Sequence, residues 1–172
     1  PADVPRLRNQ LGLLLLNQGR LVESLAVLQE SLSGLEATGD LDAQARTLCN
    51  LGTTASMMWR LDEAVAWYDR ARRAAAETGQ SLVVAGVEGN LGYLHGLRGD
   101  TILALAHYER ARAGFAALDG VDLSVATLES DAARTLLDAG LTAEAGDAAR
   151  RALSMAEPGG NQMLMAQCRL LL

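Results

Sequence analysis

Aromatic residues, cysteine and proline are scarce in this sequence. Aromatic residues make up 3% of the 172 residues, and there are two cysteines and three prolines. A core with so few rings has to be built from Leu, Ala and Val, which allows helices to pack closely. Cys49 and Cys168 lie far apart in the chain, so we expect free thiols in a reducing cytoplasm rather than a disulfide.

A membrane span, a secretion signal and a surplus of basic residues are also lacking. No apolar run reaches the ~18 residues that a transmembrane helix needs, and the first residues have neither the basic end nor the apolar segment of a signal peptide. The formal net charge of −6 makes nucleic acid and anionic membrane surfaces poor partners. Because an initiator Met is absent and the last residues are apolar, we expect a fragment of a longer protein.

Motifs for catalysis, cofactors and metals are missing as well. There is no Gly-x4-Gly-Lys-Ser/Thr segment, no His-Glu-x2-His and no Cys-x2-Cys. Gly86, Gly89 and Gly92 have the wrong spacing for a dinucleotide loop and fall within an expected helix. His95 and His107 fall on opposite helices of one hairpin, and we favour a half-buried structural His95 over a metal or acid–base role. The segment is therefore predicted to be non-enzymatic, with no cofactor and no metal.

What the sequence does contain is a repeat with a period of 40 residues. Leu-Gly pairs recur at 11–12, 51–52 and 91–92, and other residue types keep the same step. A fixed period of about 20–50 residues is typical of solenoids, whose units bury their apolar faces on one another. The fourth repeat is shifted by one residue, since Gly99 aligns with Gly140, and an insertion in the loop near 119–122 explains the shift.

Each repeat has the pattern of two helices. Apolar residues recur at steps of three and four, glycines follow the expected helix ends, and Asp40 and Asp100 stand where a helix start needs a side-chain acceptor. Short linkers make neighbouring helices antiparallel. The expected helices are 4–18, 21–37, 41–58, 61–77, 81–97, 101–117, 122–138 and 142–156, with a ninth beginning near Asn161.

Two of the repeats resemble the tetratricopeptide repeat (TPR). The TPR pattern has a Leu-Gly pair, an Ala 13 residues after the Leu, an aromatic residue four positions on and a further Ala. The matching residues are Leu51, Gly52, Ala64, Tyr68 and Ala71 in one repeat, and Leu91, Gly92, Ala104, Tyr108 and Ala111 in the next. Leu48 and Glu88 replace the opening Trp of the family. The resemblance implies that the Gly lets helices approach and that the Tyr fills the wedge between repeats.

The fold that this resemblance implies is all-α: a right-handed TPR superhelix, or α–α solenoid, of four helix-turn-helix repeats plus a truncated fifth. We expect residues 1–172 to form a single domain. Its repeats would span about 4–38, 41–78, 81–118 and 122–157, followed by a partial helix at 161–172.

The resemblance also implies a concave groove, lined by the first helix of each repeat, that binds a protein or peptide with apolar anchors. Asn50 and Asn90 would either hold a ligand backbone or bond to a neighbouring helix. Gly86, Gly89 and Gly96 would either form a shallow trough for a ligand or pack against a neighbouring helix. The groove residues carried over from the family are Asn9, Leu13, Leu16, Arg46, Cys49, Asn50, Thr53, Met57, Gly86, Gly89, Asn90, Tyr93 and Arg134.

Arginines recur on the second helices of the second, third and fourth repeats. We interpret them as a solvated face with local ion pairs rather than as a site for an acidic partner. They are Arg70, Arg72, Arg73, Arg110, Arg112, Arg150 and Arg151.

Residues 90–152 resemble, more specifically, the TPR arm of actinobacterial CHAT-domain proteins, which are caspase-like. The resemblance rests on 90–94, 97–100, 113–118 and 136–145. It implies a bacterial recognition arm that recruits or senses a partner for a peptidase domain elsewhere in the parent protein. The alternative is the sensor arm of a bacterial transcription regulator or signalling ATPase. We also expect a weak homodimer through the exposed solenoid ends.

Overall fold

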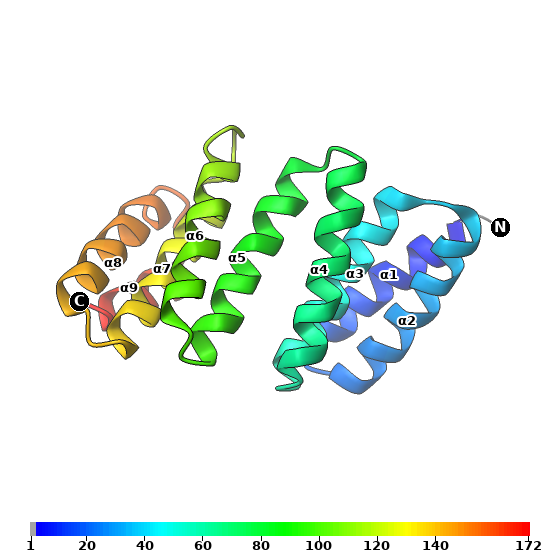
Figure 1. The fold of residues 1–172 in the computed structure, drawn as a ribbon, viewed down its shortest axis with the longest axis horizontal. Coiled ribbons are helices and arrows are strands. Elements are labelled where there is room, and N and C mark those ends of the chain that lie inside the picture. Colours follow the sequence, from blue (N-terminus) through cyan, green and yellow to red (C-terminus); the bar gives the residue numbers. More distant parts are fainter. Residues whose placement is uncertain (1–2) are drawn as a thin grey trace. The chain divides into compact units, whose positions relative to one another are not determined.

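The computed structural model describes residues 3–172, and it folds them into nine helices joined by short turns (Figure 1). No strand occurs in this range, so the expected all-α fold is confirmed. Each helix begins and ends within two residues of its predicted bounds. The helices are α1 (Asp3–Asn17), α2 (Leu21–Thr38), α3 (Leu41–Met57), α4 (Leu61–Glu77), α5 (Ser81–Leu97), α6 (Thr101–Phe115), α7 (Asp122–Asp138), α8 (Thr142–Ala156) and α9 (Gln162–Leu170).

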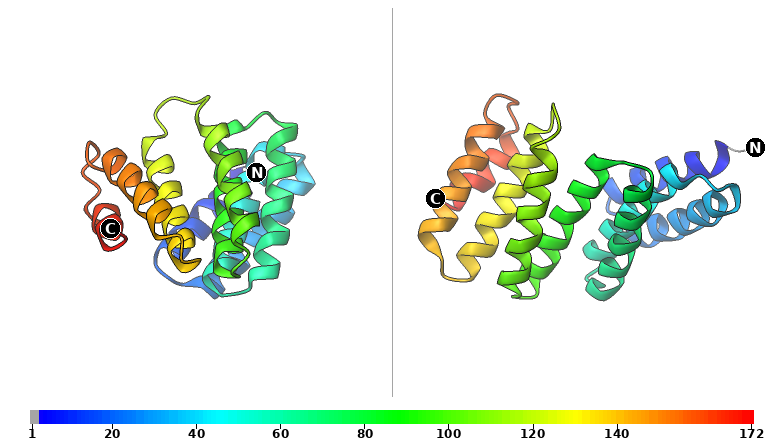
Figure 2. Two further views of the ribbon diagram at one scale, coloured as in Figure 1. Left: turned by 60° about the vertical axis from the view of Figure 1, so that its left-hand side comes forward. Right: turned by 45° about the horizontal axis from the view of Figure 1, so that its top comes forward.

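The chain divides into two compact units, and the division falls between Val87 and Glu88, inside α5. In the first unit α1 packs on α2, α2 on α3 and α3 on α4, and α1 also contacts α3. In the second unit α6 packs on α7, α7 on α8 and α8 on α9, and α7 also contacts α9. Each unit therefore stacks antiparallel helix pairs so that first helices touch one another, as in a TPR array (Figure 2). We call α1, α3, α5 and α7 the first helices and α2, α4, α6 and α8 the second helices.

Alanine and leucine form the core, as the scarcity of rings predicts. One cluster in the second unit holds Ala133, Leu136, Ala145, Ala148 and Ala149. Because Ala carries only a methyl group, α7 and α8 can lie close to each other along their whole length.

Glycine brings the two helices of a repeat together against an aromatic ring. A Cβ atom on Gly52 would lie 2.6 Å from the ring of Tyr68, and one on Gly92 would lie 2.7 Å from the ring of Tyr108. The Tyr108 hydroxyl lies 3.3 Å from Thr135 Oγ1 on α7, so this tyrosine also reaches the next repeat. The predicted roles of glycine and of Tyr108 are confirmed.

The turn between the two helices of a repeat needs a left-handed residue. Gly19, Gly99 and Gly140 supply it with φ angles of 73°, 80° and 78°. In the second repeat Trp59 takes this place with a φ of 60°, although residues with a Cβ rarely adopt that conformation. The helix break predicted there is present, but it is built from a strained residue.

The two predicted aspartate caps have different outcomes. Asp40 Oδ1 accepts a hydrogen bond of 3.2 Å from the Ala43 N–H, which caps α3. Asp100 makes no such bond at the start of α6, and its carboxylate instead lies 3.6 Å from His95 Nδ1. The predicted capping bond of Asp100 is therefore wrong, because the carboxylate lies beside His95 on the preceding helix rather than against the first N–H groups of α6.

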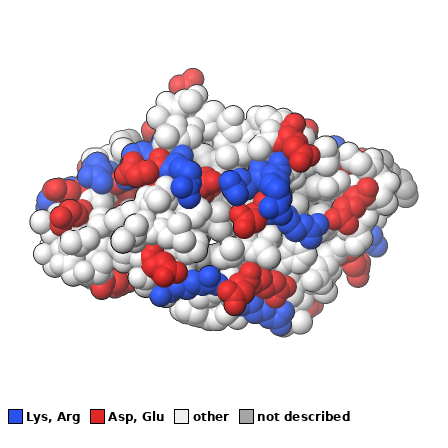
Figure 3. Space-filling model, viewed as in Figure 1, with Lys and Arg blue, Asp and Glu red and all other residues white. Residues whose placement is uncertain are grey.

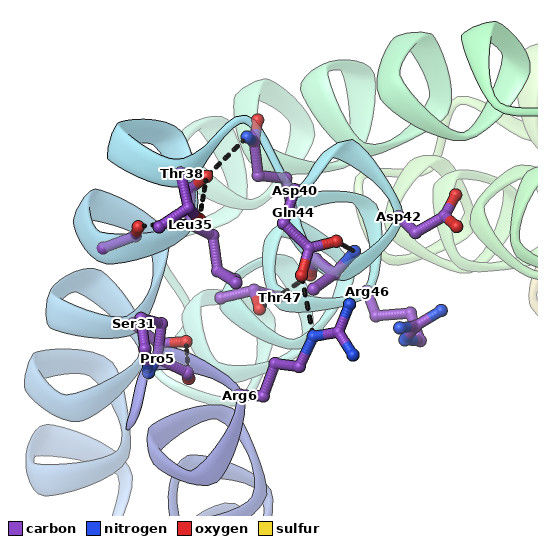
Figure 4. A network of polar contacts seen from close by, with 12 residues as sticks. Pro5, Arg6, Ser31, Leu35, Thr38, Asp40, Asp42, Gln44, Arg46 and Thr47 are labelled. Carbon is purple, nitrogen blue, oxygen red and sulfur yellow. Dashed lines mark hydrogen bonds and ion pairs between the residues drawn. The ribbon is translucent and has the colours of Figure 1, made fainter. Parts of the chain in front are cut away.

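Asp40 also joins the first repeat to the second, as Figure 4 shows. Arg6 Nε donates to Asp40 Oδ2 at 2.7 Å, and this bond from Arg6 holds the pKa of Asp40 below its usual range. Nearby, Gln44 Nε2 donates to the Leu35 carbonyl at 3.0 Å, and the Ser31 hydroxyl donates to the Pro5 carbonyl at 2.6 Å. These polar contacts fix the register of α1, α2 and α3 around their apolar core.

Candidate partner-binding surface

In the first unit, two asparagines of the predicted groove bond to each other. Asn50 Nδ2 on α3 donates to Asn9 Oδ1 on α1 at 3.0 Å. Of the two roles left open for Asn50, the structure therefore contains the bond to a neighbouring helix. Asn9 and Leu16 are 8% and 6% exposed, so both support the surface from below and contribute little of it.

The other predicted groove residues of this unit offer partial or full exposure. Met57 is 52% exposed at the end of α3, while Leu13, Cys49, Thr53 and Gly86 are half-buried. Arg46 is exposed, and its guanidinium donates to Gln80 Oε1 at 3.3 Å. The Thr53 hydroxyl lies 3.0 Å from the Tyr68 hydroxyl. Apolar and polar side chains are thus mixed along α1 and α3, as expected for a surface that binds peptides.

In the second unit, two glycines of α5 pack against α7. A Cβ atom on Gly89 would lie 3.3 Å from Leu128 Cδ1, and one on Gly96 would collide with the Thr135 side chain. The trough hypothesis is therefore wrong for both residues, because a helix already occupies the space beside them. At Gly86, by contrast, a Cβ atom would meet nothing within 4 Å.

These contacts show which sides of α5 and α7 face each other. Tyr93 lies between Gly89 and Gly96 at helical spacing, so it shares the side of α5 that faces α7. Asp131 lies in the same way between Leu128 and Thr135, on the side of α7 that faces α5. The two remaining groove residues of this unit are Asn90, which is half-buried on α5, and Arg134, which is exposed one turn after Asp131.

Asp131 was not among the predicted site residues. Burial disfavours its charged form and raises its pKa to about 6, although the nearby Arg134 charge acts in the opposite direction. Within residues 3–172, no side chain or N–H group donates a hydrogen bond to its carboxylate. The sequence did indicate that Asp131 belongs to the same surface as two predicted groove residues, since Asn50, Asn90 and Asp131 stand in equivalent places at steps of 40 and 41.

Two buried glutamates were also missed. Glu88 is 5% exposed and accepts a bond of 2.8 Å from Arg110 Nε, while Glu129 is 1% exposed and accepts bonds of 2.7 Å from both Arg112 and Arg151. Burial works to raise the pKa of Glu88, but the bonds from Arg110 and His107 outweigh it and lower that pKa. Glu88 replaces the opening Trp of the TPR pattern, and Glu129 stands 41 residues later.

The recurring arginines do form local ion pairs, as predicted. Arg70 pairs with Glu36 at 2.9 Å and Arg150 with Asp147 at 2.6 Å, both near the solvent. Basic and acidic side chains lie next to one another on the face drawn in Figure 3. Because Arg110, Arg112 and Arg151 reach buried carboxylates, part of the arginine series belongs to the packing between helices rather than to a solvated face.

The two histidines of the chain stack on each other. Their rings, from His95 and His107, lie 5.1 Å apart with an angle of 6° between the planes. His107 Nδ1 lies 2.8 Å from Glu88 Oε2, and the pKa of His107 is lowered, first of all by burial. His95 is half-buried, as expected. Among residues 3–172, no three His, Cys, Asp or Glu side chains gather closely enough to hold a metal ion.

Comparison with known proteins gives the family of this fold. Residues 3–77 match the family model of the tetratricopeptide repeat. The helix pairs that follow this stretch have the same type of fold, as the solved structures below show. No curated protein matches the sequence. In addition, none of the helices within residues 3–172 is long and apolar enough to cross a membrane.

Solved structures resemble the chain over nearly its whole length. The crystal structure of BtubC (BKLC) from P. vanneervenii is similar with a TM-score of 0.76 and 20% identity, over 91% of this chain and 64% of that one. This chain thus spans less than two thirds of BtubC. Nearly identical TPR-like repeats of a Podosopora anserina protein assigned to the kinesin light chains have a TM-score of 0.72 and 15% identity, over 99% and 96% of the two chains. At these identities the likeness shows the fold alone.

Proposed function

We propose that the first helices form the binding surface of a non-catalytic scaffold, which recruits or senses a protein or peptide. TPR repeats are in general protein-interaction scaffolds. The observation that carries the proposal for this chain is the contact between successive first helices, α1 with α3 and α5 with α7. Within each unit, such adjacency places half-exposed side chains of successive first helices, such as Leu13 and Thr53 in the first unit, on a surface wider than one helix. An extended peptide or an amphipathic helix binds to surfaces of this kind.

The proposal is tested by peptide selection followed by matched substitutions. Peptides would be selected from a random 12-residue display library on the immobilised chain, and their affinities would be measured for two variants. Met57→Asp alters an exposed apolar residue at the end of a first helix, whereas Ile102→Asp alters one that is 88% exposed on the second helix α6. We expect Met57→Asp or Tyr93→Ala to weaken binding at least tenfold and Ile102→Asp to leave it unchanged. The proposal would be refuted if substitutions on first and second helices weakened peptide binding equally, or if no peptide were selected.

For the parent protein, we propose that this chain is the recognition arm of a CHAT-type caspase-like peptidase of a bacterium. The support is the sequence resemblance over residues 90–152. The full-length gene sequence tests it, since a domain with a His and Cys pair is expected alongside the repeats. A phosphate-binding loop or a helix-turn-helix domain in its place would instead identify the sensor arm of a transcription regulator or signalling ATPase.

Three smaller predictions accompany this proposal. A location in the cytoplasm is supported by Cys49 and Cys168, which form no disulfide within residues 3–172. The organisation of residues 1–172 as one solenoid domain stays a prediction. A weak homodimer through the ends is supported by exposed apolar side chains on α1, such as Leu7 and Leu14, and by Leu170 at the end of α9. Sedimentation equilibrium over a wide concentration range tests the dimer.

A further inference from the structure

We propose that Asp131, together with Tyr93, forms a binding site for a basic side chain of the partner protein. The ligand group would be a lysine ammonium or an arginine guanidinium. This inference rests on the proposed function and adds to it the chemistry of one anchor residue of the partner.

The position of Asp131 is fixed by contacts on both sides. Leu128 and Thr135, one turn before and after it, lie against Gly89 and Gly96 of α5. Tyr93 is the residue between those glycines, so it and Asp131 come from facing sides of adjacent first helices. The Tyr108 hydroxyl lies 3.3 Å from Thr135 Oγ1, which donates to the Asp131 carbonyl at 3.1 Å. Burial is the main cause of the raised pKa of Tyr108, and Asp131 and Tyr93 add to it through their charges. Asp131 and Tyr93 thus both lie near the Tyr108 hydroxyl.

A comparison between repeats explains why Asp131 has no donor. In the first unit, Asn50 donates to Asn9, which stands one repeat earlier on the neighbouring first helix. The residue equivalent to Asn50 in the fourth repeat is Asp131, and the residue equivalent to Asn9 in the third is Gly89. Gly89 has no side chain that could donate a hydrogen bond to the Asp131 carboxylate. The side-chain bond found between α1 and α3 therefore has no counterpart between α5 and α7.

The Asp131 side chain is half-buried, and no donor among residues 3–172 replaces the water that its carboxylate has lost. Withdrawal of a charge from water is unfavourable unless the charge is paired and hydrogen-bonded, and a cation is the group that does both. Charge-assisted bonds from ammonium or guanidinium groups are about twice as strong as neutral ones. An aromatic ring nearby, here that of Tyr93, can pack against the alkyl stem of the ligand or attract its charge.

No charged or titratable group among residues 3–172 forms a hydrogen bond or an ion pair with the Asp131 carboxylate, so the carboxylate is available to a cation of the partner. From α5 the neighbour is Tyr93, from α6 it is Tyr108, and from α7 it is Arg134. Tyr108 is engaged with Thr135 at 3.3 Å. Arg134 is exposed and acts on Asp131 through its charge, but within residues 3–172 it forms no ion pair with this carboxylate shorter than 4 Å. A ligand cation would therefore have to compete only with a solvated arginine, and Arg134→Gln is expected to strengthen binding.

The test uses the peptides selected from the random library. Affinities at pH 7.5 would be compared for the unaltered chain, Asp131→Asn and the control Glu144→Gln, which removes an exposed carboxylate of the second helix α8. We expect Asp131→Asn to weaken binding at least tenfold and Glu144→Gln to have no effect. Replacing one Lys of the peptide by norleucine, or one Arg by citrulline, should cost the same factor, and it should cost nothing further when Asp131 is already Asn.

The outcomes separate this inference from the proposed function. Peptides that bind on the first helices but are indifferent to Asp131→Asn would overturn the inference and leave the proposed function intact. If no peptide is selected, both are overturned. Acid gives a second readout, because protonation of Asp131 should weaken binding of the unaltered chain between pH 7.5 and pH 5 and should leave the binding of Asp131→Asn unchanged.

Discussion

At the residue scale, a few glycines determine how closely the helices of a repeat approach. Gly92 has the ring of Tyr108 directly against it, and that ring is 1% exposed. The sequence predicted this contact because the Leu-Gly pair and the later aromatic keep a fixed separation. It left open whether Gly89 and Gly96 form a trough or pack on another helix, because a residue without a side chain carries no polarity that would indicate its surroundings.

Substitution of Gly92 by Ala should therefore destabilise the fold. The new methyl group would overlap the buried Tyr108 ring, and overpacking of this kind costs about 1–3 kcal/mol. Gly146→Ala is the control, because it lies inside α8 with only the Arg150 guanidinium, 3.5 Å away, near the added atom. That variant should be up to about 1 kcal/mol more stable. Urea unfolding measures the free energy of unfolding of both variants. Equal values would contradict the claim that the Tyr108 ring leaves no room for a side chain at position 92.

Asp131 should lower the stability of the fold at neutral pH. Its pKa is raised from 3.8 to about 6 in the folded chain. Between these values the folded state binds a proton that the unfolded state has lost, so stability decreases as the pH rises through this window. Asp131→Asn should thus stabilise the chain by about 1–3 kcal/mol at pH 7.5 and by much less at pH 4.

Urea unfolding at the two pH values tests this prediction, with Asp138→Asn as the control that should change little at either. If Asp131→Asn stabilises the chain equally at both pH values, desolvation of the Asp131 charge is not the cause of the stabilisation. A residue that costs stability and is retained for binding would be a usual kind of compromise at a functional site.

At the scale of the helices, the sequence predicted all nine within residues 3–172, because apolar periodicity and glycine stops are local signals. What it could not predict is how side chains choose partners on other helices. Glu129 is buried because Arg112 and Arg151 reach it from α6 and α8. Asp100 is not a cap because its carboxylate lies beside His95. Both outcomes depend on three-dimensional neighbours that no spacing within one helix contains.

The turn between α3 and α4 offers a test at this scale. Trp59 is 71% exposed and left-handed, whereas the equivalent residues of the other repeats are glycines. Trp59→Gly should raise stability by about 1 kcal/mol, since a Cβ in this conformation costs that much and little packing is lost. Arg60→Gly is the control, because its φ of −88° is normal and no gain is expected. Thermal unfolding compares the two, and a destabilised Trp59→Gly would show that the indole contributes more than its strain costs.

At the scale of the whole molecule, each of the two units is a stack of antiparallel helix pairs with the TPR type of fold. The TPR fold could be predicted from one sequence because the repeat supplies several independent observations of the same pattern. The candidate surface could be predicted only in part. Carry-over from the family placed the surface on the first helices, and this stays a prediction. It included Leu16, which is buried, and it did not include Asp131.

Hydrogen–deuterium exchange with and without a selected peptide is the most direct test of the central claim, that partners bind along the first helices. We expect the peptide to slow exchange in first helices, including the segment of α7 around Asp131, and to leave α2, α4, α6 and α8 nearly unchanged. Protection confined to the second helices, or to the turns between repeats, would contradict it.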